Sequence, residues 1–219
     1  MPRASRRRSP PPSAVSGRIL WILVGVNVLV YIAWQSAIRA GDDSFLAGLM
    51  LGNFMVSLEA VSAGRYWTLL TSAFSHIDPI HLFVNMLALW VFGRDVLQIV
   101  GRLAFLHLYV VGAILASLGH VAYSLVTGEP NPAVGASGSV MAIAVVFAAL
   151  FPRRTLLINF FIPVPAALAV AAYIVLDVVG AFGGIAGQTA HAAHLGGAAY
   201  GLIYWLLVVR PRFRQRQRR

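Results

Sequence analysis

The stretch G-A-S-G-S-V-M-A-I-A-V-V-F-A-A-L-F, residues 135–151, joins a serine-containing turn to a long apolar run. An uncharged run of this length fits a helix that is buried in a membrane. A second apolar run begins with A-H-L-G-G-A-A-Y-G, residues 193–201. Because a hydroxyl and an imidazole are costly to place in hydrocarbon, Ser137 and His194 near the ends of two apolar runs predict a functional site.

The composition of the whole chain also predicts a membrane protein. Of its 219 residues, 59% are apolar and only 11% are charged, whereas roughly a quarter of the residues in a soluble domain are charged. The chain has no cysteine. That absence excludes disulfides, thiol nucleophiles and cysteine-ligated metal sites.

The apolar segments predict an all-α bundle of six transmembrane helices. Residues 1–17 are expected to form a disordered basic tail, residues 18–209 the membrane core, and residues 210–219 a second basic tail. Residues 39–78 form a long outer loop, whose apolar part at 45–58 is expected to lie in the membrane interface. The first apolar segment is too long for a signal peptide and is interpreted as an uncleaved anchor. The six predicted spans are 18–38, 79–98, 103–126, 136–152, 163–182 and 187–209.

The arginines predict the orientation of the bundle. The chain has 17 basic residues and a formal net charge of +10, and with six spans all basic residues except Arg39 and Arg65 fall on the side of the two tails. Because short arginine-rich loops stay in the cytoplasm, we expect both termini there, in a multi-pass protein of the plasma (inner) membrane. Terminal arginine clusters next to apolar spans fit contact with anionic lipid. We therefore expect the lipid bilayer as a partner and do not expect nucleic acid.

This topology brings Ser137 and His194 to one depth. Each lies sixteen residues before an arginine at the cytoplasmic boundary, Arg153 and Arg210 respectively. Both therefore sit roughly 24 Å above that boundary in a hydrocarbon core about 30 Å thick. A hydrogen bond between the two side chains becomes possible if their helices touch.

Small residues favour contact between these two helices. Gly138 and Ala142 lie one turn apart on the first helix, and Gly197 and Gly201 lie one turn apart on the second. Such small faces let membrane helices approach closely.

A third polar element is H-L-F-V-N, which contains His81 and Asn85. The two residues are four apart, so they share a helix face, at roughly 20 and 14 Å above the cytoplasmic boundary. Both can donate hydrogen bonds to a developing oxyanion. Ser137 follows Gly135 at the start of its helix, so its backbone N–H lacks an intrahelical partner and can join them.

Together these motifs resemble those of the rhomboid family of intramembrane serine proteases. G-A-S-G at 135–138 is similar to the family's nucleophile motif, and A-H-L-G-G-A-A-Y-G to its A-H-x-x-G-x-x-x-G motif. H-L-F-V-N is similar to its H-x-x-x-N motif, and His76 stands where the family often has histidine. The resemblance covers residues 18–209 and includes the six-span core.

The resemblance implies a role for each matching residue. Ser137 is the expected nucleophile, and His194 is the expected general base and acid of a catalytic dyad. His81, Asn85 and the Ser137 backbone are expected to stabilise the oxyanion. The implied substrates are single-pass membrane proteins, cut in or near a locally unstable transmembrane helix. Movement of the fifth span and of the glycine-rich segment 180–187 would admit substrate and water, and no cofactor or metal is implied.

Two positions depart from the family pattern. Trp67 is followed by Thr68, where family members often have arginine. Met141 stands where many members have a tyrosine that stacks on the catalytic histidine, and its thioether is expected to pack there more loosely. The residues expected to support the site are Gly135, Gly138, Gly197, Gly201 and Met141.

Other polar residues offer competing assignments. Ser139 is a second hydroxyl, but it faces away from Ser137 on a helix. His191 lies one turn before His194 and nearer to water, so we expect a surface or gating role. These histidines could suggest zinc, but no carboxylate or cysteine accompanies them at a ligand spacing, so no metal is expected. Asp177 could complete a triad, but the resemblance implies a dyad, which favours a packing or interfacial role.

Two other functions remain open from the sequence. The first is a rhomboid-like protein that binds membrane clients without cutting them. Such relatives lack the serine or the histidine, whereas this chain has both. The second is a small transporter, which would spread polar residues through the membrane depth. Here they cluster in the outer half, and no inverted repeat is visible.

Overall fold

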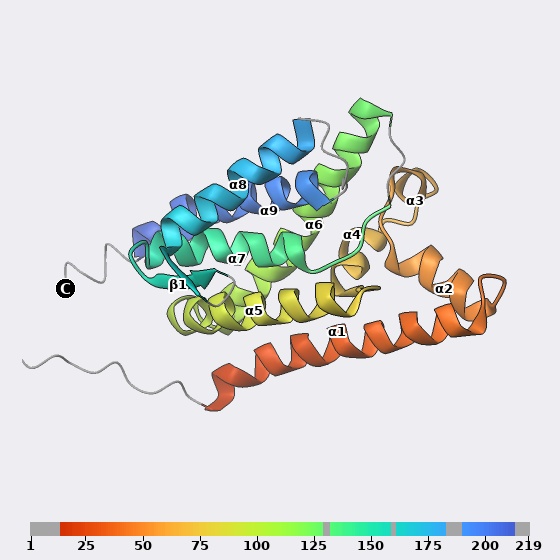
Figure 1. Cartoon of the computed structure of the whole chain (residues 1–219), viewed down its shortest axis with the longest axis horizontal. Coiled ribbons are helices and arrows are strands. Elements are labelled where there is room, and N and C mark those ends of the chain that lie inside the picture. Colours follow the sequence, from red (N-terminus) through yellow and green to blue (C-terminus); the bar gives the residue numbers. More distant parts are fainter. Residues whose placement is uncertain (1–13, 129–131, 159–160, 183–189, 213–219) are drawn as a thin grey trace, which may run out of the picture.

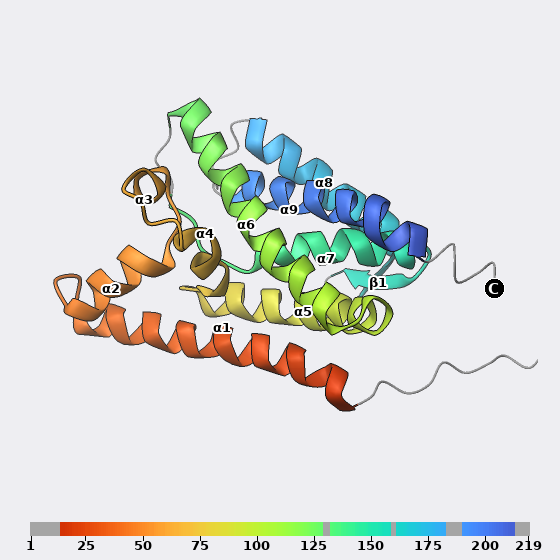
Figure 2. The same cartoon turned by 180° about the vertical axis from the view of Figure 1, so that it is seen from behind.

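Helix α7, Ser137–Leu150, lies at the centre of the fold, and its residues from Gly138 to Ala148 are all buried. The computed structural model describes residues 14–128, 132–158, 161–182 and 190–212. In both views of the chain, α8 and α9 lie on one side of α7 and α5 lies on the other (Figures 1 and 2). Helix α1 is outermost and runs beside α5.

Apolar helices stand at each of the six predicted spans, and the all-α membrane fold is confirmed. Within the described residues, four helices are long and apolar enough to cross a membrane, while α7 and α8 are shorter apolar helices. The long helices are α1 (Ala14–Ala40), α5 (Pro79–Val100), α6 (Arg102–Thr127) and α9 (Ala190–Tyr204), which continues as the π-helical turn η2 (Trp205–Val209); α8 spans Ala166–Phe182.

The length of α7 sets the depth of its first residue. With 14 residues, this helix rises only about 21 Å, less than the hydrocarbon core of about 30 Å. Arg153 and Arg154 follow its inner end. With Arg153 and Arg154 at the cytoplasmic boundary, as the sequence predicts, Ser137 is expected to lie below the outer membrane surface.

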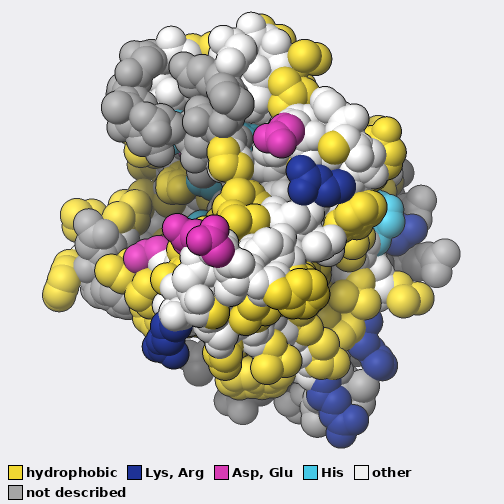
Figure 3. All heavy atoms as spheres, turned by 90° about the vertical axis from the view of Figure 1, so that its right-hand side faces the viewer, with side chains coloured by type: hydrophobic (Ala, Val, Ile, Leu, Met, Phe, Trp, Pro, Cys, Tyr) yellow, Lys and Arg dark blue, Asp and Glu magenta, His cyan; other side chains and the backbone are white. Residues whose placement is uncertain are grey.

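The outer segment between α1 and α5 contains four short helices rather than one interfacial stretch. They are α2 (Phe45–Phe54), α3 (Leu58–Ser62), α4 (Thr68–Thr71) and the 3-10 turn η1 (Ser72–Phe74). Ser44 and Ser57 cap α2 and α3 by accepting backbone N–H groups. Exposed acidic side chains, including Asp42, Asp43 and Glu59, gather on this end of the molecule (Figure 3, magenta).

A two-stranded hairpin precedes α8, where the sequence predicted the beginning of the fifth span. Strand β1 (Thr155–Ile158) pairs antiparallel with β2 (Ile162–Pro165). The prediction that this span begins at residue 163 is therefore wrong by three residues. Prolines at 163 and 165 lack the N–H that a helix needs, so they lie in an extended strand. On the same side of the bundle, Arg154 pairs with Asp95 of α5 at 2.7 Å.

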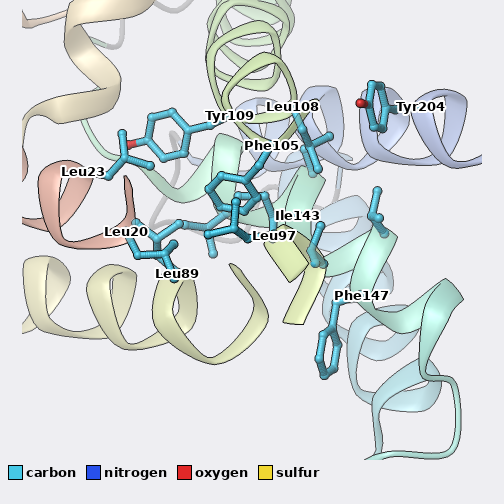
Figure 4. Close-up of a cluster of buried hydrophobic side chains, with 14 of the residues drawn as sticks. Leu20, Leu23, Leu89, Leu97, Phe105, Leu108, Tyr109, Ile143, Phe147 and Tyr204 are labelled. Carbon is cyan, nitrogen blue, oxygen red and sulfur yellow. The ribbon is translucent and has the colours of Figure 1, made fainter. Parts of the chain in front are cut away.

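The buried core joins the long helices around α7 (Figure 4). Large apolar side chains also point outward from α1, α5 and α8, including Leu29, Phe83 and Leu176. An apolar exterior suits contact with lipid chains. The labelled core side chains in Figure 4 are Leu20, Leu23, Leu89, Leu97, Phe105, Leu108, Tyr109, Ile143, Phe147 and Tyr204.

Candidate active site

The turn before α7 holds Ser137 at the first position of the helix. Ala136 donates its N–H to Nε2 of His76 at 3.4 Å. Gly135 has a φ of 129°, and a Cβ at this position would lie only 2.7 Å from Cε1 of His81. Both facts require glycine there. Since Ser137 begins the helix, its N–H has no intrahelical partner and can bind a ligand oxygen.

His76 supports this turn only as a neutral imidazole. Its side chain is fully buried, and burial, reinforced by the neighbouring ring of His81, lowers the pKa of His76 to about 3. The two rings meet edge to face with centroids 5.0 Å apart. An uncharged Nε2 keeps the lone pair that accepts the Ala136 N–H.

We expect the stability of the protein to fall as the pH falls through the range set by His76. The pKa is about 3 in the folded state and about 6.5 in an unfolded chain, so the unfolded chain binds more protons between these values. The stabilisation is fully present above about pH 6.5 and decreases towards about pH 3, with a slope of at most about 1.4 kcal/mol per pH unit. Thermal unfolding in detergent from about pH 8 to about pH 5 measures it. A His76→Gln variant should show a shallower slope, and equal slopes would contradict the assignment.

Glycines bring α9 directly against α7. A Cβ at Gly197 would overlap the backbone carbonyl of Gly138, so the two backbones touch at this point. Gly201 repeats the contact one turn further along α9. His194 lies one turn before Gly197, and Ser137 lies next to Gly138. His194 therefore lies one turn from the point where α9 touches the first turn of α7, which begins with Ser137. The hydrogen bond between the two side chains stays a prediction.

His194 is held by a buried carboxylate on the neighbouring helix α8. Its Nδ1 donates to Oδ1 of Asp177 at 3.0 Å, and the side chains are 9% and 4% exposed. Donation from Nδ1 leaves the lone pair on Nε2, the form that can accept a proton. His194 Nε2 is buried and has no hydrogen-bond partner within the described part of the chain. Hydrogen bonds to a catalytic base are often open before substrate binds.

The structure corrects two interpretations of Asp177. A packing or interfacial role was expected, but Asp177 instead contacts His194 and also accepts from Nδ1 of His191 at 2.8 Å. The statement that no carboxylate accompanies the histidines at a ligand spacing is also wrong. Sequence separation could not reveal this contact, because it depends on how α8 packs against α9. His191 is only half-buried, as expected for a residue nearer to water.

The oxyanion residues predicted on α5 lie at the beginning of that helix. Asp78 caps α5 by accepting the N–H of His81 at 2.7 Å, which fixes the first turn. The His81 ring packs against Gly135, close to Ser137 Oγ. Asn85 lies one turn further along, and its Nδ2 donates to the carbonyl of His81 at 2.9 Å. The second N–H of that amide is still available as a donor.

A cavity of about 240 Å³ opens beside Ser137. It reaches between the outer segment, the turn before α7 and helix α6. Its polar lining includes His81, Ser117 and His120, and small residues such as Ala116 complete its wall. A space of this size holds several water molecules or a small side chain, since one water occupies about 30 Å³ in the liquid.

The family model for the rhomboid domain matches residues 63–211, which include α4 to α9 and the predicted catalytic and oxyanion residues. The chain belongs to the rhomboid family. Among its relatives is RHOMBOID-like protein 12, mitochondrial, of Arabidopsis thaliana, 39% identical over 88% of this chain and 59% of that protein.

Two further relatives of this rhomboid come from yeast and fish. Rhomboid protein 1, mitochondrial, of Saccharomyces cerevisiae is 34% identical over 92% of this chain and 56% of its own length. Presenilin-associated rhomboid-like protein A, mitochondrial, of Danio rerio is 31% identical over 83% of this chain and 45% of its own length. The rhomboid chain thus spans about half the length of the curated relatives that it matches.

In this rhomboid, the aromatic ring beside His194 comes from α8. The ring of Tyr173 lies 5.7 Å from the His194 ring, centroid to centroid. Met141, expected at the family's stacking position, is buried in a cluster that includes Val170. Tyr173 was not predicted as a site residue. Its position four residues before Asp177, on the same face of one helix, was the available signal.

Thr68, the second departure from the rhomboid pattern, makes its hydrogen bond within its own segment. Thr68, which follows Trp67, is fully buried, and its hydroxyl donates to the carbonyl of Arg65 at 2.7 Å. The indole of Trp67 donates to Oδ1 of Asn53 at 3.0 Å. Both side chains therefore bond to residues of the segment between α1 and α5.

Proposed function

We propose that this rhomboid is an active intramembrane serine endopeptidase that cleaves transmembrane segments through an acyl-enzyme. The observation that carries the proposal is the state of His194: Nδ1 donates to Asp177, and Nε2 is buried with no hydrogen-bond partner among the described residues. His194 lies one turn from the point where α9 touches Gly138, the neighbour of Ser137. A serine hydroxyl beside such an imidazole can be activated as a nucleophile.

In the proposed reaction, Ser137 Oγ attacks a substrate carbonyl carbon while its proton passes to His194 Nε2. The carbonyl oxygen takes up negative charge beside the Ser137 N–H and the His81 side chain. When the C–N bond breaks, His194 gives that proton to the leaving amine. A water molecule then attacks the ester carbonyl and loses a proton to His194. When the ester C–O bond breaks, His194 gives that proton to Ser137 Oγ, which restores the free hydroxyl.

The position of Ser137 supports a membrane segment as substrate. The nucleophile begins a short central helix, below the outer surface. The neighbouring cavity of about 240 Å³ supplies room for a small substrate side chain or for the hydrolytic water. Single-pass membrane proteins with an unstable helix near that depth are the proposed partners, because a helical peptide bond is shielded from attack.

We further propose a membrane of the mitochondrial inner type, in place of the plasma membrane predicted from the sequence. The relatives named above are described as mitochondrial, and none of these descriptions supports a plasma-membrane location. Both arginine-rich tails would lie on one side, and the active site would open to the other. Fluorescence imaging of the tagged full chain beside markers of the two membranes tests this location.

The proposed activity can be tested without a known substrate. We expect a fluorescent fluorophosphonate to label the purified, detergent-folded chain, because the probe reacts with an activated serine. Ser137→Ala and His194→Ala should not be labelled. Ser139→Ala is the matched control and should be labelled, since Ser139 Oγ donates to the carbonyl of Tyr109 at 2.8 Å instead of facing the base. An unlabelled parent that unfolds cooperatively would contradict the proposal and favour a client-binding role.

A further inference from the structure

We propose that Asp177, His191 and His194 form a binding site for a transition-metal cation such as Zn²⁺, and that the bound ion switches off His194. The binding site stands on its own geometry, whereas the switch rests on the proposed proteolytic function. The site lies between α8, which carries Asp177, and the first turn of α9, which carries both histidines.

The three side chains already present a set of zinc ligands. Asp177 Oδ1 lies 2.8 Å from His191 Nδ1 and 3.0 Å from His194 Nδ1, and the three ligand atoms lie within 4.8 Å of one another. Neighbouring ligands of a tetrahedral zinc ion are about 3.3 Å apart, given bonds of about 2.0 to 2.2 Å. Each short contact therefore needs to lengthen by only a few tenths of an ångström. Two imidazoles and one carboxylate leave a fourth position for water.

A second observation, an unpaired carboxylate oxygen, also indicates that this site suits a cation. Oδ2 of Asp177 is buried and has no hydrogen-bond partner among the described residues. A buried carboxylate oxygen without a donor is costly, because it has lost water without replacement. A divalent cation between Asp177 and the histidines would compensate that oxygen's charge directly.

The position of His191 makes the site both rigid and accessible. Its ring packs directly on the backbone of Gly180 in α8, where any Cβ would overlap the ring. The segment 180–187 was expected to form a loop. The structure instead places Gly180 inside α8, and residues 183–189 lie outside the described residues. The side chain of His191 is 27% exposed, compared with 4% for Asp177. An ion can therefore arrive at His191 from water and reach the buried carboxylate.

Metal binding at Nδ1 changes the chemistry of His194. The ion takes the place of the hydrogen that Nδ1 donates to Asp177; Nδ1 gives up its proton to solvent while Nε2 takes one up from solvent, so the ring stays neutral and no net proton is released. A neutral imidazole bound through Nδ1 carries its one hydrogen on Nε2. Nε2 then has no lone pair to accept the proton of Ser137, so the base is lost until the metal leaves. Mg²⁺ and Ca²⁺ prefer all-oxygen sites and should not replace zinc here.

Binding is measured first on Ser137→Ala, which removes the nucleophile and leaves all three ligands. The full chain, carrying a tag without histidine, is stripped with a chelator, and Zn²⁺ is titrated by calorimetry or equilibrium dialysis. We expect one Zn²⁺ per chain and no competition by Mg²⁺. Adding His191→Gln or Asp177→Asn should weaken binding by at least about tenfold. His107→Gln is the matched control and should leave binding unchanged, because His107 lies elsewhere, bonded to Tyr200.

The switch is measured by the rate of fluorophosphonate labelling. Zn²⁺ should slow labelling of the parent, and a chelator should restore it. His191→Gln should be labelled at the same rate with zinc as without it, each rate being compared within that variant. Absence of zinc binding to Ser137→Ala would overturn the site. Binding that survives His191→Gln would overturn its ligands, and binding without slower labelling would overturn the switch. A parent that binds zinc but is never labelled would contradict the proposed function alone.

Discussion

Asp177→Asn is expected to slow fluorophosphonate labelling by at least about 10²-fold while the protein remains folded. In soluble serine proteases, replacing the aspartate behind the catalytic histidine with asparagine slows turnover by about 10⁴-fold, because the imidazole adopts the wrong tautomer. Asp177 makes the equivalent contact here, 3.0 Å from His194 Nδ1. The amide NH₂ of asparagine can face Nδ1, which moves the imidazole hydrogen to Nε2.

The labelling kinetics separate a positioning role from general damage. Loss of positioning should lower kinact and leave KI nearly unchanged, because the probe still binds the same cavity. Asp95→Asn is the matched control, since it removes a carboxylate of α5 that pairs with Arg154 and not with His194. Asp177→Asn that is labelled within a few-fold of the parent would show that the carboxylate does not position His194.

Gly197→Val is expected to lower stability by at least about 3 kcal/mol and to abolish labelling. Overpacking a core usually costs about 1–3 kcal/mol, and here the obstacle is backbone rather than a movable side chain. A Cβ at residue 197 would overlap the carbonyl oxygen of Gly138. The α9 helix must therefore move away from α7, and His194 moves with it.

Thermal unfolding in detergent, measured beside the labelling rate, tests this prediction. Gly25→Val is the matched control, because Gly25 lies in the long helix α1 with no atom within 4 Å of the added Cβ. We expect that control to unfold close to the parent and to be labelled normally. If Gly197→Val behaved like Gly25→Val, the close packing of α7 on α9 would not be what aligns the dyad.

The helices were readable from the sequence because they depend on local apolar patterns, whereas the common depth of Ser137 and His194 stays a prediction. Apolar runs define helices, and the distance from Ser137 and His194 to a following arginine defines depth. The contact of Gly197 with Gly138 was likewise suggested by the spacing of small residues. Each of these sequence patterns can be recognised within one helix, or as the same spacing of small residues in two helices.

The features that the sequence did not predict depend on how different elements meet. Asp177 and Tyr173 reach His194 only because α8 packs beside α9, and no local pattern reports which face of α8 turns inward. The hairpin before α8 was missed because its residues are as apolar as those of a membrane span. Its two prolines were the signal for extended backbone.

The two contacts that α8 makes with His194 have a consequence for the order of substrate entry and cleavage. Tyr173 and Asp177 both belong to α8, which is the fifth span that was expected to move when substrate enters. If that helix swings outward, the imidazole loses its carboxylate and its aromatic neighbour at the same moment. Under the proposed proteolytic function, cleavage therefore waits until α8 has returned to its place beside α9. The helix expected to move for substrate entry would then also be the helix that positions the catalytic base.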